Sequence, residues 1–179
     1  VADLAALEPL GVSAGGAAEL QGTLAGASLR DMTLLASLQG KGLSYEAVAL
    51  GDLTAEVAAT GLPDAPVGSV TLDAPATAYG PLALQADITP LENGGFQLEP
   101  LALRWGEALA LDGRLAAAPE GLPLTGTLGG KLAQSPLLEQ LGIPLQGSGT
   151  LTLELTASEG RQGATVKLGL APGRLAGIA

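Results

Sequence analysis

Short runs in which apolar and polar residues alternate constrain the fold of this chain more than any other feature of its sequence. In one such run, Leu53, Ala55 and Val57 alternate with Thr54 and Glu56. A period of two is typical of a β-strand with one buried and one wet face. The 27 Gly and 12 Pro residues interrupt the chain so often that few windows suit the helices that Leu and Ala favour. The sequence therefore predicts many short strands.

Two hairpins can be placed from the same pattern. The pair Asn93-Gly94 lies between alternating runs and is a strong signal for a tight turn. We therefore expect the segment that begins at Phe96 to return antiparallel to residues 82–88. Residues 150–156 and 165–170 are separated by a Ser- and Gly-containing turn and predict a second hairpin.

Two short helices are expected beside the strands. Residues 3–10 begin with a possible cap at Asp3 and carry apolar residues at helical spacing. Residues 135–142 begin with Ser135 as cap and Pro136 at the first helical position, and Gly142 closes the segment. Neither helix should exceed one or two turns.

About twelve strands with one apolar and one polar face fit a closed barrel, a sandwich or an open curled sheet, and the alternation alone does not choose among them. Aromatic residues make up only 2% of the chain, which favours a thin, extended architecture over a thick core. A loose Leu-x-Gly-x-Leu phrase recurs, for example at residues 20–24 and 124–128. Such imperfect repeats favour stacking along an axis. The fold class predicted is all-β, with residues 1–179 forming a single repetitive segment.

Composition excludes several classes of function. Eight Lys and Arg residues against eighteen Asp and Glu give a net charge of −10, and the basic residues are scattered singly. No basic stripe is present to neutralise phosphates, so nucleic acid is not an expected partner. The chain has no Cys and no His, which removes disulfides, thiolate and imidazole metal sites and the Ser-His-Asp arrangement. We expect no cofactor and no metal, and we predict that the protein is not an enzyme.

Three pairs of residues could still suggest catalysis. Asp52 with Glu56, or Asp112 with Glu107, could act as the paired carboxylates of a glycosidase, and Lys41 near Ser44 could imitate a Ser-Lys dyad. Each acid falls on the polar phase of a strand or in a turn, where solvation is sufficient to explain it, and the Lys41 and Ser44 pair spans a Gly turn. We therefore interpret all three pairs as surface residues.

Several longer phrases resemble those of a known family. They are residues 61–68 (GLPDAPVG), 109–115 (LALDGRL), 122–128 (LPLTGTL) and 141–147 (LGIPLQG). At these phrases the chain resembles the TamB family, the inner-membrane-anchored subunit of the translocation and assembly module, and more broadly the AsmA-like bridge proteins. The resemblance extends over nearly the whole chain but is a style of sequence, with no single diagnostic motif.

The resemblance implies a long, largely antiparallel sheet that curls into an apolar groove, the β-taco. It implies phospholipid transport between the inner and outer membranes of a Gram-negative bacterium and a role in outer-membrane protein assembly. The expected location is the periplasm, in a parent protein anchored in the inner membrane, of which this chain would be an internal fragment. The expected partners are phospholipid acyl chains and, through parts of the parent protein outside this chain, an Omp85-type protein.

The resemblance also implies that the apolar stripes line the groove; in a sandwich the same stripes would be core. The candidate lining residues are Leu53, Val57, Val70, Leu72, Leu82, Leu84, Ile88, Leu109, Leu111, Leu115, Leu151, Leu153, Leu155, Val166 and Leu168. Trp105 and Phe96 could contact lipid, but we interpret them as local core plugs.

Two other functions compete with the lipid-conducting bridge. One is a structural or adhesive β-solenoid of a secreted surface protein, in which the stripes form a dry, closed core. Such solenoids usually carry polar ladders at a regular period, whereas this chain has a single Asn and an irregular repeat. The other is a soluble periplasmic lipid carrier with a closed pocket. We therefore favour the bridge.

Overall fold

The fold is described from a computed structural model of the chain. It describes residues 2–3, 14–28, 31–45, 48–92, 94–119, 123–140, 145–158 and 161–170.

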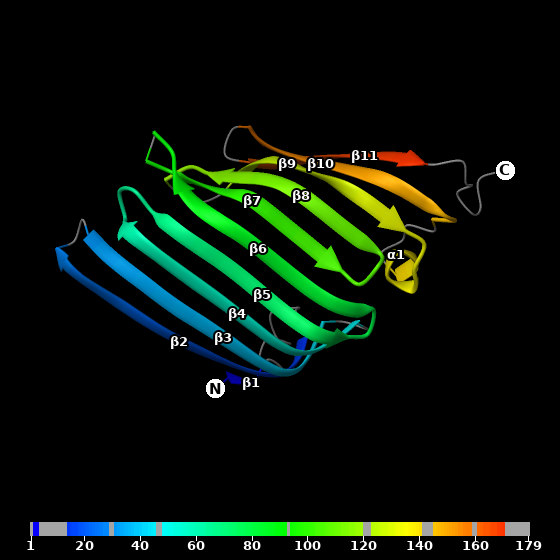
Figure 1. Cartoon of the computed structure of the whole chain (residues 1–179), viewed down its shortest axis with the longest axis horizontal. Coiled ribbons are helices and arrows are strands. Elements are labelled where there is room, and N and C mark those ends of the chain that lie inside the picture. The colour runs from blue at the N-terminus through cyan, green and yellow to red at the C-terminus, as the bar shows by residue number, and fades with distance from the viewer. Residues whose placement is uncertain are drawn as a thin grey trace.

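Strands occupy most of the described chain, and a single short helix interrupts them (Figure 1). The first three strands after β1 are the longest, at 15 residues each. The elements are β1 Ala2–Asp3, β2 Ala14–Ser28, β3 Asp31–Tyr45, β4 Val48–Leu62, β5 Val67–Thr77, β6 Gly80–Pro90, β7 Phe96–Trp105, β8 Leu109–Ala117, β9 Leu124–Ala133, α1 Pro136–Gln140, β10 Ser148–Ser158 and β11 Arg161–Leu170.

All strands belong to one sheet, in which each strand pairs antiparallel with its neighbours in the sequence. The order runs from β1 to β11 without a crossover, and β2 and β11 lie far apart on opposite sides of the sheet (Figure 1). The prediction of an all-β, curled and largely antiparallel sheet is confirmed. Among the three architectures that the alternation allowed, the chain adopts the open curled sheet. About twelve strands were expected, and eleven are described, of which β1 has only two residues.

The second predicted helix is confirmed as α1. The Ser135 hydroxyl accepts a hydrogen bond from the Leu138 backbone N–H at 3.4 Å, and Pro136 is the first helical residue, as expected for a capped N-terminus. The first predicted helix lies mostly on residues outside the description, and its expected cap, Asp3, lies in β1 instead. No helix in the described part of the chain is long and apolar enough to cross a membrane.

Both predicted hairpins are present. In the first, Ile88 pairs with Leu98 across β6 and β7, and the turn is closed by a hydrogen bond from the Leu91 N–H to the Gly95 carbonyl. In the second, Leu153 pairs with Val166 across β10 and β11. These pairings place the apolar residues of each hairpin on the same side of the sheet, because directly opposed residues of antiparallel strands share a face.

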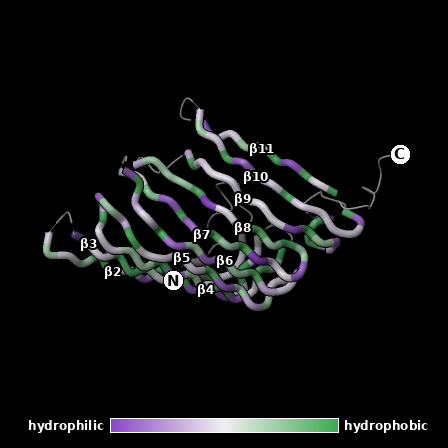
Figure 2. Tube along the Cα trace, turned by 45° about the horizontal axis from the view of Figure 1, so that its top comes forward, coloured by the Kyte–Doolittle hydropathy of each residue, from purple (hydrophilic) through white to green (hydrophobic). Residues whose placement is uncertain are grey.

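The two faces of the sheet differ in burial as well as in chemistry. In β6, Ala86 and Ile88 are buried, whereas their neighbours Gln85 and Asp87 are exposed. Figure 2 shows the same alternation of hydrophobic and hydrophilic positions along the other strands. Each strand therefore contributes one apolar and one polar side to the sheet, as the period of two predicts.

Candidate apolar groove

Three continuous rows of apolar residues and glycines cross the sheet from β2 to β11, and together we call them the apolar face. Each row follows directly paired residues from strand to strand. The first row is Leu20, Leu38, Ala55, Leu72, Leu84, Leu103, Leu111, Gly130, Leu151 and Leu168. The second row is Gly22, Ala36, Val57, Val70, Ala86, Leu101, Gly113, Leu128, Leu153 and Val166. The third row is Leu24, Leu34, Ala59, Gly68, Ile88, Leu98, Leu115, Gly126, Leu155 and Ala164. None of these positions carries a polar or charged side chain.

All the residues that the sequence proposed as groove lining share this face. Leu53, Leu82 and Leu109 lie two residues along their strands from the first row, and the others are members of the three rows. Because side chains two residues apart in a strand point the same way, the structure brings the whole proposed set together on one side of the sheet.

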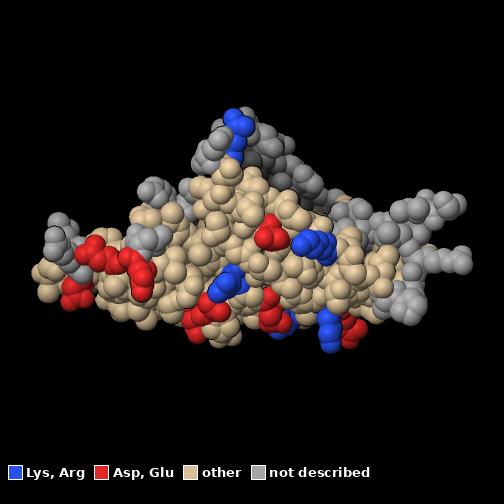
Figure 3. Space-filling view, turned by 90° about the horizontal axis from the view of Figure 1, so that it is seen from above, with Lys and Arg blue, Asp and Glu red and all other residues tan. Residues whose placement is uncertain are grey.

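The charged residues of the ladders lie on the opposite face. They occupy positions between the apolar ones and include Glu19, Glu56, Asp73, Asp87, Arg104, Asp112, Arg114, Lys131, Glu154 and Lys167. Figure 3 shows the charged groups visible from one side as small red and blue clusters on a mostly uncharged surface. The separation means that a ligand on the apolar face meets no charge from the ladders.

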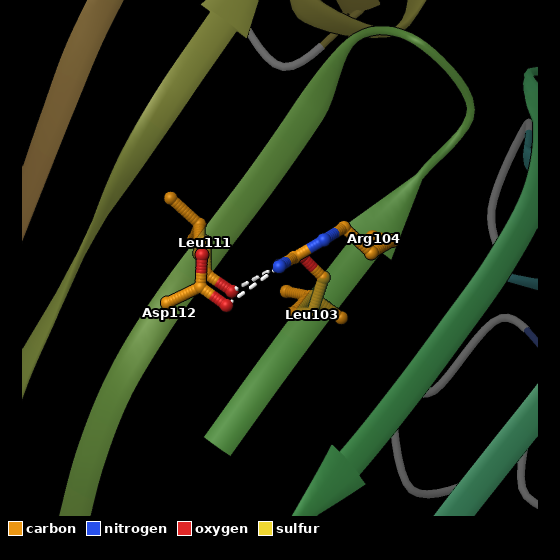
Figure 4. A network of polar contacts seen from close by, with 4 residues as sticks. All are labelled: Leu103, Arg104, Leu111 and Asp112. Carbon is orange, nitrogen blue, oxygen red and sulfur yellow. Dashed lines mark hydrogen bonds and ion pairs between the residues drawn. The ribbon is translucent and has the colours of Figure 1, made fainter. Parts of the chain in front are cut away.

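One ion pair links two neighbouring strands on the polar face (Figure 4). Arg104 of β7 donates a hydrogen bond from Nη2 to Asp112 Oδ1 of β8 at 2.6 Å and one from Nη1 to the Leu111 carbonyl at 2.7 Å. Both side chains are about half exposed, and such pairs contribute little to stability. Asp112 is therefore held by a structural contact, which agrees with its interpretation as a surface residue.

The sheet is curled (Figure 1), and some glycines on its apolar face permit the close approach of neighbouring strands. A Cβ added to Gly130 would lie 1.8 Å from the Ala110 carbonyl oxygen, and one added to Gly113 would lie 2.1 Å from that of Thr127. The adjacent Gly129, on the polar face, has only one atom near its Cβ position, at 3.9 Å. A side chain on the inner side of this bend would collide with the backbone.

The centre of the apolar face is packed and its two ends are open. Ala86, Leu101, Leu111 and Leu128 form a buried cluster, with Leu111 only 4% exposed. In contrast, the side chain of Leu20 in β2 is 74% exposed. At the other end, in β11, Val166 and Leu168 are also exposed. The apolar face is thus buried in the middle and accessible at both ends.

Helix α1 covers the apolar face at one rim of the sheet. Its Leu137 and Leu138 are almost completely buried, and Leu138 packs with Leu132 and Leu145 in a cluster that also touches Leu109 and Leu151. Since Leu109, Leu132 and Leu151 lie on the apolar face of β8, β9 and β10, the helix closes the groove on the side where these strands turn.

At the opposite rim, turn residues form an apolar pocket of about 280 Å³ over the third row. Leu34, Ala59 and Ile88 provide its floor, and Pro63 and Phe96 are among the residues around them. This pocket was not predicted from the sequence. The prolines after residue 62 and Phe96 are visible in the sequence as apolar residues near turns. A pattern within one strand, however, does not show which turns lie side by side.

A larger hollow, of about 710 Å³, lies at the strand ends near β11. It is lined partly by the polar face, including Lys131 and Thr150, and partly by Leu132 and Leu170. A mixed and widely open lining of this kind offers less apolar contact to an acyl chain than the three rows do, so we place the candidate site on the apolar face.

The aromatic residue Trp105 acts as a plug at the edge of the face. Its indole N–H donates a hydrogen bond to Thr77 Oγ1 at 2.8 Å, and its ring packs edge to face against Tyr79, with 6.3 Å between the ring centroids. Thr77 is the only buried polar residue in the described chain. These contacts agree with the interpretation of Trp105 as local core, whereas Phe96 lines the pocket at the other rim.

Asp52 and Glu56, which the sequence offered as a carboxylate pair, both lie in β4. The Asp52 carboxylate accepts a hydrogen bond from the Gly42 backbone N–H at 3.0 Å, across β3 and β4. Glu56 and Glu107 are exposed. The described residues contain no group of three or more acidic side chains placed to hold a metal ion.

Several residues of the apolar face were missing from the predicted lining. Leu98 and Leu101 are three residues apart, yet both point to the apolar face because the ladder between β7 and β8 shifts register between them. The Leu20 and Leu24 positions of β2 were also left out. They show a clear period of two in the sequence, which could have identified them.

Comparison with known proteins adds no relative to this description. No protein-family model, no curated protein and no solved structure matches the chain.

Proposed function

We propose that this chain is a segment of a periplasmic bridge in a Gram-negative envelope, and that its apolar face carries phospholipid acyl chains between the inner and outer membranes. In this proposal the parent protein, of the TamB or AsmA-like kind, is anchored in the inner membrane and supports outer-membrane protein assembly. Contact with an Omp85-type partner is assigned to parts of the parent protein outside this chain. The segment itself is not an enzyme and needs no cofactor.

One observation carries the proposal: the apolar face is continuous from β2 to β11, uncharged and accessible at both ends. An acyl chain gains about 0.8 kcal/mol for each methylene that leaves water, and this gain does not depend on direction or on a particular partner group. A row of Leu, Val, Ala and Gly can therefore hold an acyl chain without fixing it at one position, which is what transport along a groove requires.

The rival structural solenoid requires a dry core enclosed by stacked coils. In this sheet the neighbours are sequential and antiparallel, and Leu20 and Val166 present the same apolar face to solvent at the two ends. A closed-pocket carrier would need the face to be covered all round. Both features support the open groove over these alternatives.

The test is native mass spectrometry with lipid extraction of the 179-residue chain after expression in a Gram-negative host. We expect phospholipid to co-purify with the unaltered chain and to be lost from the Leu153→Asp/Leu168→Asp variant, which places two charges on the apolar face of β10 and β11. The matched control is Thr152→Asp/Thr165→Asp, which places two charges on the polar face of the same strands and should retain the lipid.

Circular dichroism of each variant establishes that the sheet is retained. A folded, lipid-free unaltered chain would contradict the proposal and would support the closed structural alternative. Equal lipid loss from the two variants would also contradict it, because lipid would then not depend on the apolar face.

A further inference from the structure

The apolar pocket of about 280 Å³ at the turn rim, which we call the rim pocket, belongs to the interior of the sheet. Strands β3, β4, β6 and β7 contribute lining residues, together with the β4–β5 turn, the β6–β7 turn and Pro119 just after β8. Each of these four strands is paired on both of its sides. The rim pocket therefore does not depend on the two edges of the sheet.

One wall of the rim pocket is the turn between β4 and β5. Pro63 and Pro66 of this turn line the pocket, and Pro66 is buried. Within the turn, the Ala65 N–H donates a hydrogen bond to the Gly61 carbonyl at 2.8 Å. Because proline fixes its own φ and the turn is closed by a backbone hydrogen bond, this wall has little freedom to lose when a ligand binds.

The facing wall is built from the β6–β7 turn, from Phe96 and from Pro119. The Gly94 N–H donates a hydrogen bond to the Leu91 carbonyl at 3.0 Å and so closes this turn. A Cβ added to Gly94 would lie 3.6 Å from Pro119 Cγ, so the turn and the segment after β8 are in close proximity. Both walls are therefore formed before a ligand arrives.

The lining offers hydrocarbon and no polar side chain. It consists of Leu34, Val57, Ala59, Leu62, Pro63, Pro66, Ile88, Gly94, Phe96 and Pro119. A polar or charged group placed among these side chains would leave water without a side-chain partner, which is costly. The part of a ligand that enters the rim pocket must therefore be apolar.

The volume suits part of a lipid and not a whole one. A cavity of about 150 Å³ with apolar walls holds one benzene-sized molecule, and pockets for drug-sized ligands begin at about 300 Å³. The rim pocket, at about 280 Å³, lies between these sizes. It can hold one end of an acyl chain while the rest of the lipid stays outside.

The floor of the rim pocket joins it to the apolar face. Leu34, Ala59 and Ile88 of the floor are members of the third row, in which Gly68 links Ala59 to Ile88. An acyl chain on the apolar face can thus reach the rim pocket along the third row without crossing a polar side chain.

The charges in the two wall turns distinguish the two ends of a phospholipid. Asp64 lies between the two prolines of the first turn, and Glu92 precedes Gly94 in the second. Both are exposed, and neither turn contains a basic residue. A phosphate group at this rim would meet charges of its own sign, whereas the methyl end of an acyl chain carries no charge. The charges therefore favour the methyl end at the rim pocket.

We propose that the rim pocket is a binding site for the methyl end of a phospholipid acyl chain. This site rests on the proposed function, because the chain reaches it from the apolar face. It adds a fixed position and an orientation to a surface that otherwise holds acyl chains anywhere along its rows: the methyl end lies between the two wall turns, and the headgroup lies away from them.

Photo-crosslinking with a labelled lipid tests the site on the unaltered 179-residue chain. Two phosphatidylglycerols are used that differ only in the place of a photoreactive diazirine, which is at the methyl end of one acyl chain or next to its carbonyl group. After irradiation, the adducts are assigned to residues by tandem mass spectrometry. We expect adducts at Pro63, Pro66 and Phe96 to be several-fold more abundant with the methyl-end label than with the carbonyl-end label.

A pair of variants tests whether the pocket itself holds the chain. Ala59→Leu adds volume to the floor of the rim pocket, and Ala36→Leu adds the same volume to the second row, outside the pocket lining. Methyl-end adducts at the pocket should fall several-fold in Ala59→Leu and stay unchanged in Ala36→Leu. Circular dichroism of both variants identifies a loss of folding, and the unaltered chain keeps the test decisive if a variant unfolds.

Three results would overturn the assignment of the site. They are methyl-end adducts spread evenly along the rows, a carbonyl-end label that is the more abundant one at the pocket, and equal effects of Ala59→Leu and Ala36→Leu in folded chains. Each of these leaves lipid on the apolar face and so leaves the proposed function intact. A folded chain that takes no label on the apolar face would contradict both the site and the proposed function.

Discussion

The centre and the ends of the apolar face have the same chemistry but very different environments. Leu101 in β7 is 3% exposed and Leu111 in β8 is 4% exposed, whereas Leu20 and Leu24 in β2 are mostly in water. All four belong to the same three rows. The difference arises because a central strand has neighbouring strands on both sides, while an edge strand has a neighbour on one side only. The alternating pattern thus determines to which face of the sheet a residue points, and the position of its strand in the sheet determines how deeply the residue is buried.

The largest effect should come from a charge in the centre. Leu111→Asp would bury a carboxylate among leucines with no partner, and we expect a loss of about 4 kcal/mol or more of unfolding free energy. Leu24→Asp places the same charge on the same face at the end, where the loss should stay within about 0.5 kcal/mol. Urea denaturation of both variants makes the comparison. Similar losses would mean that the centre is not packed as described.

Truncation of an apolar side chain should also lower the unfolding free energy more in the centre of the apolar face than at its end, but by less than a buried charge does. Leu101→Ala leaves a cavity in the buried cluster, and we expect it to cost about 2–5 kcal/mol. Leu20→Ala at the exposed end should cost about 0.5 kcal/mol or less. The midpoint of urea unfolding, with an unchanged slope, is the measurement. Equal shifts for the two variants would show that end and centre are packed alike.

The tight inner side of the curl can be tested with two adjacent glycines. Gly130→Ala would place a methyl group against the Ala110 carbonyl oxygen, and the backbone shift that it forces should cost about 1–3 kcal/mol. Gly129→Ala on the polar face meets no such contact and should be neutral or slightly stabilising. The two variants are compared by thermal unfolding. If Gly129→Ala destabilised the chain more, the assignment of the inner face would be wrong.

The smallest effect should come from the ion pair of the polar face. Loss of the contact in Arg104→Ala or Asp112→Ala should change stability by at most about 1 kcal/mol, because both groups are half exposed. A double-mutant cycle isolates the interaction between them, and its value should fall as salt is added. A large coupling that resists salt would require a buried pair, contrary to the exposure observed.

The sequence was sufficient for the strands and for their faces, because a period of two is a local property. Thus Leu53 and Val57, and also Leu153 and Val166, were assigned correctly to one side. The helix at Pro136 could also be predicted from the sequence, since its cap and first turn are local. The burial of its side chains could not be predicted, because the almost complete burial of Leu138 depends on Leu132 and Leu145, which other parts of the chain supply.

Other features could not be predicted without knowing which strands pair and in which register. The register shift that keeps both Leu98 and Leu101 on the apolar face interrupts the simple alternation of β7. The hydrogen bond from Trp105 to Thr77 joins β7 to the end of β5, and the apolar pocket near Phe96 joins several turns. Each depends on residues that are distant in sequence, and no pattern within a single strand specifies them.

The proposed function requires that acyl chains contact the apolar face and not the polar one. Site-specific photo-crosslinking along β10 tests it most directly, with a photoreactive residue placed in turn at positions 151, 152, 153 and 154 of chains that are then mixed with labelled phospholipid. We expect lipid adducts at Leu151 and Leu153 and few or none at Thr152 and Glu154, a period of two that follows the strand. Adducts at all four positions alike, or at none of them in a folded chain, would contradict it.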